Sequence, residues 1–559
     1  MQDSHSNPIQ RTDISTDVAI GAIDSLRQQI RKGLQNIKAA CTVNKEFDSD
    51  LIDHYQNASF ELAFCEAEIS AASTLIDFNK QSDKQSIDFA IAILFAAESF
   101  RSVIARLRSI HIDANLSLEK LAALERSNEA RALLSSCDGN FTAEIGSRIA
   151  QDEITRLSSG VNEEKELMRE TFFRFANEVV APLAEEIHRE DKDIPEAIIK
   201  PAAELGCFGT CIPERFGGLQ PDDEPDSLGM IVVTEELSRG SLGAAGSLIT
   251  RPEIAARALL AGGTEAQQQH WLPKLAAGKI LCAISITEPN TGSDVAAVTL
   301  KATPTEGGWL LNGSKTWCTF AGKSELIVAL ARSNPDASLG YKGLSMFLIE
   351  KPSYPGRSFK HDQEAGGTLT GKAIATLGYR GMHSYDLFFE DYFVPTANLV
   401  GEESGEGKGF YYTMAGFSGG RIQTAARATG LMQAAFERAL SYANERVVFD
   451  QSLSEFQLTR IKLARMLATI TACRQFSYAV ARQMDEGQGQ MEASLVKLFS
   501  CRAAEWITRE ALQIHGGMGY AEESAVSRYF VDARVLSIFE GSEEVLALKV
   551  IARGLIEKA

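Results

Sequence analysis

The chain has 559 residues, which predicts several domains because single domains usually contain about 100–200 residues. Apolar residues make up 45% and charged residues 23% of the sequence, so a disordered or fibrous chain is excluded. The net charge of −18 argues against nucleic-acid binding through a broad basic face. Nine cysteines without a CxxC pair are typical of reduced, mostly buried thiols in the cytosol.

The start of the sequence and its longest apolar run bear on location. MQDSHSNPIQ contains no basic region followed by an apolar run, so we expect no secretory signal. The longest apolar run, Phe89 to Ala97, is far shorter than a membrane span. We therefore expect a soluble, cytoplasmic protein that does not bind a membrane.

The prolines are distributed unevenly. Of 15 prolines, one is Pro8 and the other 14 lie between Pro182 and Pro395. Because proline interrupts helix interiors, the proline-free stretches 9–181 and 396–559 favour helical bundles. The middle of the chain must then contain the turns and any sheet.

Residues 1–150 are predicted to form an N-terminal helical extension. Apolar residues recur three or four positions apart, as on one helix face, at Ile23, Leu26, Ile30, Leu34 and Ile37. The same pattern predicts helices over 51–75, 86–109 and 116–134. No catalytic motif occurs here, so we interpret the extension as a packing or oligomerisation module.

The remaining chain predicts a helical, a β and a second helical domain. Helices are expected over 163–188, 230–237 and 254–260. Short β-branched and aromatic runs between about 280 and 396 predict an antiparallel β-domain, with turns at Glu306-Gly307-Gly308 and at Asn312-Gly313. Helices then return over 416–446, 455–484, 491–514 and 545–556.

The predicted fold class is mainly α with a middle β-domain. We place the domains at 1–150 (extension), 151–280 (helical domain of the core), 281–397 (β-domain) and 398–559 (C-terminal helical bundle).

Metal and P-loop chemistry have little support. The sequence contains no HExxH motif, no His/Cys cluster at ligand spacing and no Walker motif, so we predict no metal site. The glycine-rich run Gly405–Gly409 has no preceding strand of a βαβ unit. We expect it to be a flexible entry to the next helix.

Three segments have the residue types that approach a planar or phosphorylated ligand. Thr287–Asp294 offers hydroxyls and closely spaced N–H groups after a strand. Leu311–Gly322 brings an indole, Trp317, and a hydroxyl, Thr319, to the end of another. Gln513–Ser524 interrupts two helices with three glycines, which permit close approach of the backbone. Singly, each is typical of an ordinary loop.

Together these segments resemble motifs of the acyl-CoA dehydrogenase family, flavoproteins that oxidise the α,β bond of acyl-CoA thioesters. The resemblance covers about 155–559 and rests on IPERFGG (212–218), AISITEPNTGSD (283–294), LNGSKTWCT (311–319), LFFEDYFVP (387–395), NERVVFDQSLSEFQ (444–457), QIHGGMGY (513–520) and IFEGSEEV (538–545). It implies a helical domain, a β-domain and a C-terminal four-helix bundle, as the residue patterns predict independently.

The resemblance implies that Glu540 is the catalytic base. An α-proton beside a thioester is weakly acidic, so a carboxylate must contact it while fixed donors stabilise the enolate. Some family members place the base just before an arginine that matches Arg421, but Gly420 occupies that position here. Glu540 therefore carries the assignment alone.

The resemblance also implies FAD as cofactor. Ile286, Thr287, Trp317 and Thr319 are expected around the isoalloxazine, and Gly292 and Ser293 at the pyrophosphate or the CoA edge. The FAD of a neighbouring subunit is expected to contact Arg446, Phe449, Gln457, Gln513, Gly516 and Gly517, with Ser542 and Glu544 beside its adenosine. Two positions depart from the family pattern: Asp450 replaces a glycine, and Phe530-Val531 replaces Tyr-Arg.

The long extension resembles that of a member acting on a short, branched, dicarboxylic thioester. We therefore expect oxidation of (2S)-methylsuccinyl-CoA to mesaconyl-CoA, with Arg251 binding the second carboxylate and Ser293 and Arg421 also contacting substrate. A structural salt bridge is the alternative role for Arg251. The family implies a homodimer and electron-transfer flavoprotein as acceptor. The alternatives are an acyl-CoA oxidase, a dehydrogenase for another short acyl-CoA, and a non-catalytic flavoprotein that binds a partner through its extension.

Overall fold

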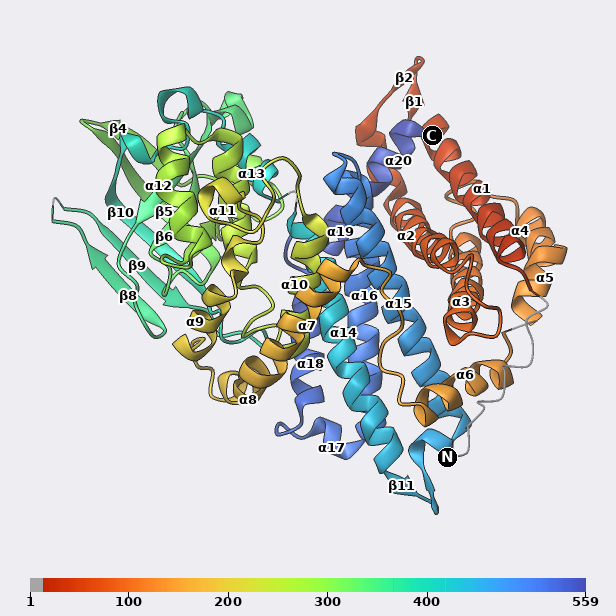
Figure 1. The fold of residues 1–559 in the computed structure, drawn as a ribbon. Helices are drawn as coiled ribbons and strands as arrows, with labels where there is room; N and C mark the ends of the chain where they lie inside the picture. Colours follow the sequence, from red (N-terminus) through yellow and green to blue (C-terminus); the bar gives the residue numbers. More distant parts are fainter. Residues whose placement is uncertain (1–13, 136, 365, 418) are drawn as a thin grey trace. The chain divides into compact units, whose positions relative to one another are not determined.

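A computed structural model describes residues 14–135, 137–364, 366–417 and 419–559. The first residues, with Pro8 and the segment in which we expect no secretory signal, lie outside this part. The chain forms two compact units, defined by residues up to 162 together with 424–559 (unit 1) and by residues 163–423 (unit 2). The structure is mainly helical with one large sheet, which confirms the predicted fold class (Figure 1).

The extension contributes six helices to the described part of unit 1: α1 Thr16–Ala40, α2 Gln56–Phe78, α3 Ile87–Ser109, α4 Leu118–Glu125, α5 Asn128–Ser135 and α6 Gly139–Gln151. A short hairpin (β1 Thr42–Val43, β2 Glu46–Phe47) and a 3₁₀ segment (Ser49–Tyr55) connect α1 and α2. The apolar positions predicted for α1 are all buried, and the hydroxyl of Ser15 accepts the Val18 N–H at its start. The predicted 116–134 helix is divided into α4 and α5. The hydroxyl of Ser127 accepts the Ala130 N–H and so caps the start of α5.

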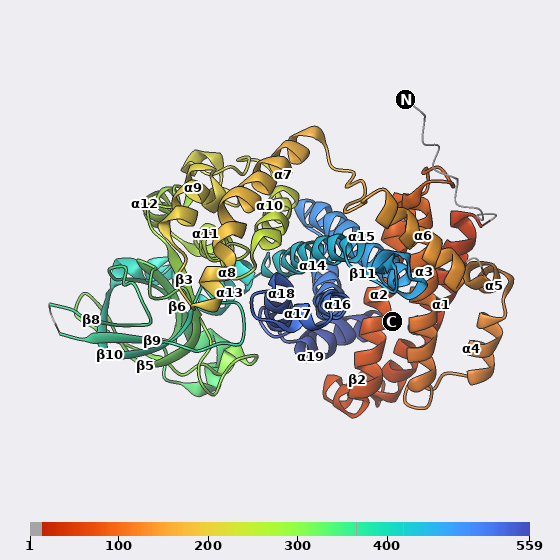
Figure 2. The same ribbon diagram turned by 90° about the horizontal axis from the view of Figure 1, so that it is seen from below.

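The C-terminal half of unit 1 is a helical bundle. Its elements are α14 Gly420–Glu445, whose residues 420–423 still belong to unit 2, the hairpin β11 Val447–Val448 and β12 Gln451–Ser452, α15 Gln457–Asp485, α16 Gln490–His515, α17 Gly517–Tyr520, α18 Ala525–Ala533, α19 Glu543–Val545, the π-helical segment Leu546–Ala552 and α20 Arg553–Lys558. Helix α2 packs against α15 and α16 as well as α1 and α3. Figure 2 shows α3 and α6 beside α15.

Helices of unit 2 precede and follow its sheet. They are α7 Glu163–Phe175, α8 Ala181–Arg189, α9 Glu196–Glu204, α10 Ser227–Gly240, α11 Thr250–Gly262, α12 Glu265–Ala276 and α13 Gly409–Phe417. A π-helical turn, Ala176–Val180, joins α7 to α8 just before Pro182. Proline has no N–H to donate to the preceding turn, which accounts for the local change of helix type.

The described strands of unit 2 form an eight-stranded sheet. They are β3 Cys282–Ser285, β4 Lys301–Thr305, β5 Gly308–Thr319, β6 Leu326–Arg332, β7 Leu344–Glu350, β8 Ser358–Asp362, β9 Thr368–Ala373 and β10 Ser384–Pro395. The order is β3-β6-β4-β5-β10-β9-β8, and β7 also pairs with β6. Successive β6 residues alternate between two cores: Leu326 and Val328 pack with α11 and α12, while Ile327 and Ala329 face the opposite core.

Two sequence predictions for this sheet are wrong. The sheet is mixed, because β3 pairs in parallel with β6. The β4–β5 hairpin lies between them in the chain, so β6 returns in the direction of β3. The second error is the turn at Asn312-Gly313, which lies inside β5 opposite a bulge of β10. The Asn312 side chain bridges that bulge through two hydrogen bonds of 2.9 Å with Asp391.

The cysteines are buried thiols, as the composition predicts. All nine cysteines are free and buried. Among the described residues, no helix has both the length and the apolar character needed to span a bilayer.

Candidate active site

A buried ion pair holds the loop after β3 in place. Lys315 on β5 donates to the Glu288 carboxylate at 2.9 Å and to the carbonyl of Ile286 at 2.8 Å. The same carboxylate accepts the N–H groups of Thr299 and Leu300. Burial raises the pKa of Glu288, but the Lys315 ammonium and these bonds outweigh it and hold the pKa below its usual range. Burial lowers the pKa of Lys315 to about 8.

Trp317 and Thr319 lie at the end of β5 beside this loop. The Thr316 N–H donates to the carbonyl of Thr287 at 2.9 Å, which holds the two segments together. Trp317 has a φ of +56°, unusual for a non-glycine residue, and its side chain is 54% exposed. The hydroxyl of Thr319 pairs with that of Ser384 at 2.8 Å.

These surroundings fit the FAD that the family resemblance implies. The exposed indole of Trp317 and the hydroxyl-bearing Thr319 lie at the same end of β5, and Thr316 joins this strand end to Thr287. Gly292 and Ser293 are exposed, and a Cβ built on Gly292 meets no atom within 4 Å, so the loop backbone is open to a ligand. An aromatic face, hydroxyls and accessible N–H groups are the donor set that a flavin and its phosphates require.

Arg251 is buried among neutral partners. It is the second residue of α11 and only 8% exposed. Its guanidinium donates to the carbonyl of Ser247 at 2.8 Å and to the hydroxyl of Tyr379 at 3.1 Å, and it lies 3.6 Å from the sulfur of Met382. In the part of the chain that the structure describes, no Asp or Glu forms a salt bridge with Arg251. The structural salt bridge considered as an alternative role is therefore not observed.

Gly420 and Arg421 begin α14. Gly420 is buried and Arg421 is half-buried in the first turn of this helix. The structure thus places Arg421 in unit 2, together with Arg251 and the loop that carries Ser293.

Glu540 occupies a strained turn of unit 1. It lies half-buried between the 3₁₀ segment Arg534–Ser537 and α19, with a φ of +54°. The buried Lys497 of α16 donates to the carbonyls on both sides of it, at 2.9 Å to Phe539 and 2.5 Å to Gly541. Left-handed conformations cost a non-glycine residue energy and are found where the surroundings enforce them. Lys497 and α16 therefore fix the backbone from which the Glu540 carboxylate projects.

The predicted intersubunit residues lie on exposed parts of unit 1. The exposed residues are Arg446, Phe449, Gln457, Gln513, Gly516, Gly517 and Glu544, whereas Ser542 is half-buried. Phe449 is 90% exposed at the tip of the β11–β12 hairpin. Its neighbour Asp450, the departure from the family's glycine, has a φ of +64°, so the two-residue turn keeps its left-handed conformation. The amide of Gln457 donates to Asn140 of the extension at 3.0 Å.

The structure brings the predicted residues together in two groups. Thr287 and Trp317 belong to unit 2, where Thr316, next to Trp317, bonds to Thr287, whereas Glu540 belongs to unit 1 with Ser542 and Glu544. Sequence reasoning missed Glu288, Lys315, Tyr379 and Lys497. Glu288 and Lys315 occur inside the quoted motifs and could have been chosen as a charged pair, but no local pattern connects Tyr379 to Arg251 or Lys497 to Glu540.

Comparisons with known proteins identify the family. Family models for the N-terminal, middle and C-terminal domains of acyl-CoA dehydrogenase match residues 162–279, 283–392 and 407–556. The chain is 45% identical over 401 residues to (2S)-methylsuccinyl-CoA dehydrogenase of Cereibacter sphaeroides, covering 72% of this chain and 71% of the relative. It is 34% identical to mitochondrial isovaleryl-CoA dehydrogenase of Pongo abelii, covering 70% of this chain and 89% of the relative.

The fold has close neighbours among solved structures. A chain from the structure of the electron transferring flavoprotein of Acidaminococcus fermentans aligns with a TM-score of 0.63 and 31% identity, covering 70% of this chain and 97% of that one. The chain belongs to the acyl-CoA dehydrogenase family, whose members depend on FAD, and it is an oxidoreductase with acyl-CoA dehydrogenase activity.

Proposed function

We propose that the protein oxidises (2S)-methylsuccinyl-CoA to mesaconyl-CoA with FAD as cofactor. The observation that carries the substrate assignment is the buried Arg251 without a carboxylate partner among the described residues. A buried guanidinium needs a counter-charge or several hydrogen-bond acceptors to offset its desolvation. The second carboxylate of a dicarboxylic thioester supplies that charge and can accept two hydrogen bonds from the planar fork.

The match to the methylsuccinyl-CoA relative supports the same substrate. About 29% of that relative and 28% of this chain lie outside the matched region, whereas only 11% of the isovaleryl-CoA relative does. Each of the two proteins thus has a further length of chain beyond the matched region.

In the proposed mechanism, Glu540 removes the α-proton. Its N–H group polarises the thioester carbonyl, and exclusion of water by the bound substrate favours proton transfer to the carboxylate. Lys497 holds the turn so that the carboxylate and the N–H act from fixed positions. FAD supplies the acceptor for the β-hydrogen and its electron pair.

The FAD is held, in this proposal, by Ile286, Thr287, Trp317 and Thr319 at its ring and by Gly292 and Ser293 at its phosphates or at the CoA edge, with Ser293 and Arg421 also contacting the substrate. A second copy of the chain supplies its exposed β11–β12 hairpin and its α17 region, which Figure 1 shows at the same end of unit 1. Exposed apolar side chains there, Phe449 and Tyr520 among them, favour such an interface. We therefore propose a homodimer.

We also propose electron-transfer flavoprotein as the acceptor, a partner favoured by the structural neighbour from such a protein.

The substrate assignment is tested with two thioesters that differ in one group. 2-Methylbutyryl-CoA carries a methyl group where methylsuccinyl-CoA carries the second carboxylate. Because truncating one partner of a buried charge pair costs about 2–5 kcal/mol, Arg251→Met should lower kcat/KM for methylsuccinyl-CoA about 30-fold or more. Turnover of 2-methylbutyryl-CoA should change little. Arg215→Met serves as the control, because Arg215 is half-exposed and bonds to Asp222 near the surface.

Glu540→Gln tests the base in the same protein. Anaerobic addition of methylsuccinyl-CoA should bleach the flavin of the wild type, while the variant should react about 10²–10⁴-fold more slowly. Equal losses on both thioesters in Arg251→Met contradict the substrate assignment, and full bleaching of Glu540→Gln contradicts the base. Steady hydrogen peroxide release without another acceptor would identify an oxidase instead.

A further inference from the structure

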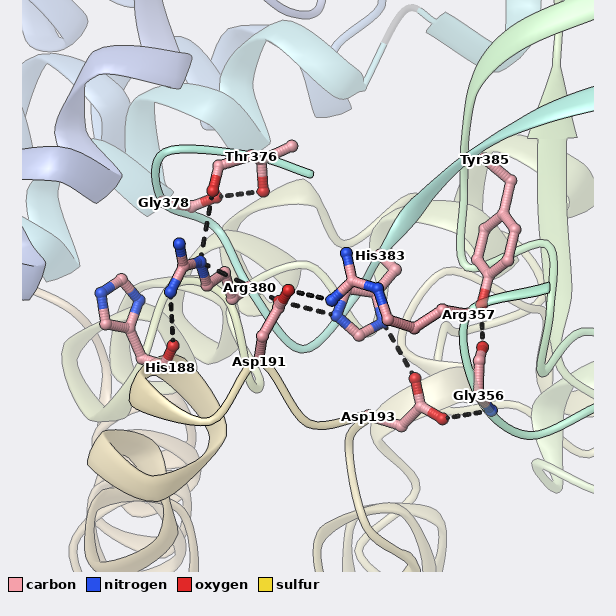
Figure 3. A network of polar contacts seen from close by, with 10 residues as sticks. All are labelled: His188, Asp191, Asp193, Gly356, Arg357, Thr376, Gly378, Arg380, His383 and Tyr385. Carbon is pink, nitrogen blue, oxygen red and sulfur yellow. Dashed lines mark hydrogen bonds and ion pairs between the residues drawn. The ribbon is translucent and has the colours of Figure 1, made fainter. Parts of the chain in front are cut away.

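His383 lies between two carboxylates at the junction of the helices and the sheet of unit 2. Its side chain is 3% exposed, with Nδ1 2.9 Å from Asp193 and Nε2 2.9 Å from Asp191 (Figure 3). Both aspartates belong to the connection between α8 and α9, 190 and 192 residues away in sequence. His383 immediately precedes β10.

The geometry requires a proton on both ring nitrogens. A carboxylate only accepts hydrogen bonds, so a ring that faces carboxylate oxygens on both sides must donate from Nδ1 and from Nε2. Burial raises the pKa of Asp193, but the bonds from His383 and from the Gly356 N–H outweigh it and hold the pKa below its usual range. Asp193 is therefore ionised at neutral pH, and His383 is an imidazolium.

Other charged groups surround this contact. Arg357 pairs with Asp191, and Arg380 lies 3.9 Å from the same carboxylate while donating to the carbonyl of His188. Lys323 approaches from the end of β5 and donates to the carbonyl of Ile194. Tyr385 donates to the carbonyl of Gly356, and burial raises its pKa to about 12, so it stays neutral.

The segment that carries His383 also carries two partners of Arg251. Tyr379 and Met382 contact the guanidinium, and Ser384, the next residue after His383, pairs with Thr319. This segment packs tightly on the turn before α11: a Cβ on Gly243 would lie 2.3 Å from the carbonyl oxygen of Arg380. A displacement of the segment is therefore transmitted to Arg251.

We infer that His383 is a positioning residue for recognition of the second carboxylate of the substrate. Its imidazolium clamps the segment 379–384 to Asp191 and Asp193, and the segment orients Arg251 through Tyr379 and Met382. This inference rests on the proposed dicarboxylic substrate.

The test compares His383→Gln with the wild type on two thioesters. The variant should raise KM for methylsuccinyl-CoA about tenfold, equivalent to about 1.4 kcal/mol, and leave KM for 2-methylbutyryl-CoA within about twofold. His361→Gln is the control, because His361 also lies in the sheet, where it pairs with Tyr354 at 3.1 Å. Equal effects on both thioesters would overturn the inference.

Two further measurements separate failure of the clamp from failure of the proposed substrate. Nitrogen-15 spectra of histidine-labelled holoenzyme, assigned by the signal lost in His383→Gln, should show both ring nitrogens protonated at pH 7. A neutral ring overturns the inference but leaves the proposed substrate standing. A wild type with the same kcat/KM for methylsuccinyl-CoA and 2-methylbutyryl-CoA overturns the proposed substrate and with it the role of the clamp. If His383→Gln does not fold, Asp193→Asn provides the variant. This change removes the charged acceptor at Nδ1, so KM for methylsuccinyl-CoA should rise while KM for 2-methylbutyryl-CoA stays within about twofold. An unchanged KM for methylsuccinyl-CoA counts against the clamp.

Discussion

Lys497→Met should separate the position of the proposed base from its chemistry. The ammonium of Lys497 donates to the carbonyls that flank Glu540, the residue in a left-handed turn. Each hydrogen bond from a charged donor is worth about 1.5–3 kcal/mol, so the two together outweigh the strain of the turn, which is about 1–3 kcal/mol. Methionine has a similar length but no donor, so the turn can relax toward an unstrained conformation.

The expected effect is on the chemical step. A misplacement of about 1 Å can cost about 100-fold in rate, so kcat should fall about 10- to 100-fold while KM changes less than about threefold. Stopped-flow bleaching of the flavin under anaerobic conditions measures the step directly. Thermal unfolding shows whether the variant is folded.

A matched lysine in the same unit gives the control. Lys549 is 57% exposed in the side chain and pairs with Asp53 on the extension, so Lys549→Met should leave the bleaching rate unchanged. A folded Lys497→Met protein that bleaches at the wild-type rate would refute the reasoning that the clamp holds the base in position.

Two predictions concern stability. Burial lowers the pKa of Lys351 from 10.5 to about 8, so the unfolded state binds the proton more tightly, and the free energy of unfolding should rise between these pH values. Denaturant titrations should find a smaller rise in Lys351→Met; an identical pH dependence would contradict the assignment. Gly146 of α6 packs on α15, where a Cβ would lie 2.0 Å from the carbonyl oxygen of Arg460. Gly146→Ala should therefore lower the free energy of unfolding by about 1–3 kcal/mol. In Gly21→Ala the new Cβ meets only a Glu129 side-chain atom at 3.6 Å, so the free energy of unfolding should rise by about 0.5–1 kcal/mol. Equal melting temperatures for the two variants would argue against this packing.

Local features were predictable from the sequence because neighbouring residues determine them. The spacing of Ile23 to Ile37 defines the buried face of α1, and the hydroxyl of Ser15 caps its start. The two motif segments that carry Thr287 and Trp317 are joined by the bond from the Thr316 N–H to the carbonyl of Thr287, and the resemblance included both segments. The Asn312-Gly313 pair shows the limit of such reasoning: its residues favour a turn, but pairing with the bulged β10 determines the conformation.

The electrostatic framework could not be predicted, because its partners are distant in sequence. Arg251 meets Tyr379 across 128 residues, and His383 meets its aspartates across 190 and 192. No periodicity relates such positions, and each pair exists only because the sheet and helices of unit 2 have folded. A histidine or an arginine in isolation therefore carried no signal of its partner.

Helix α2 shows why the extension belongs to the same core as the proposed base. Consecutive residues from Leu62 to Cys65 are all buried, so this helix is enclosed on all sides and not only along one stripe. A helix of this kind needs partners all around it, and α1 and α3 supply only part of them, while α15 and α16 supply the rest. Because α16 also carries Lys497, the packing of α2 supports the helix that holds the Glu540 turn. The extension therefore stabilises the half of the enzyme that carries the proposed base.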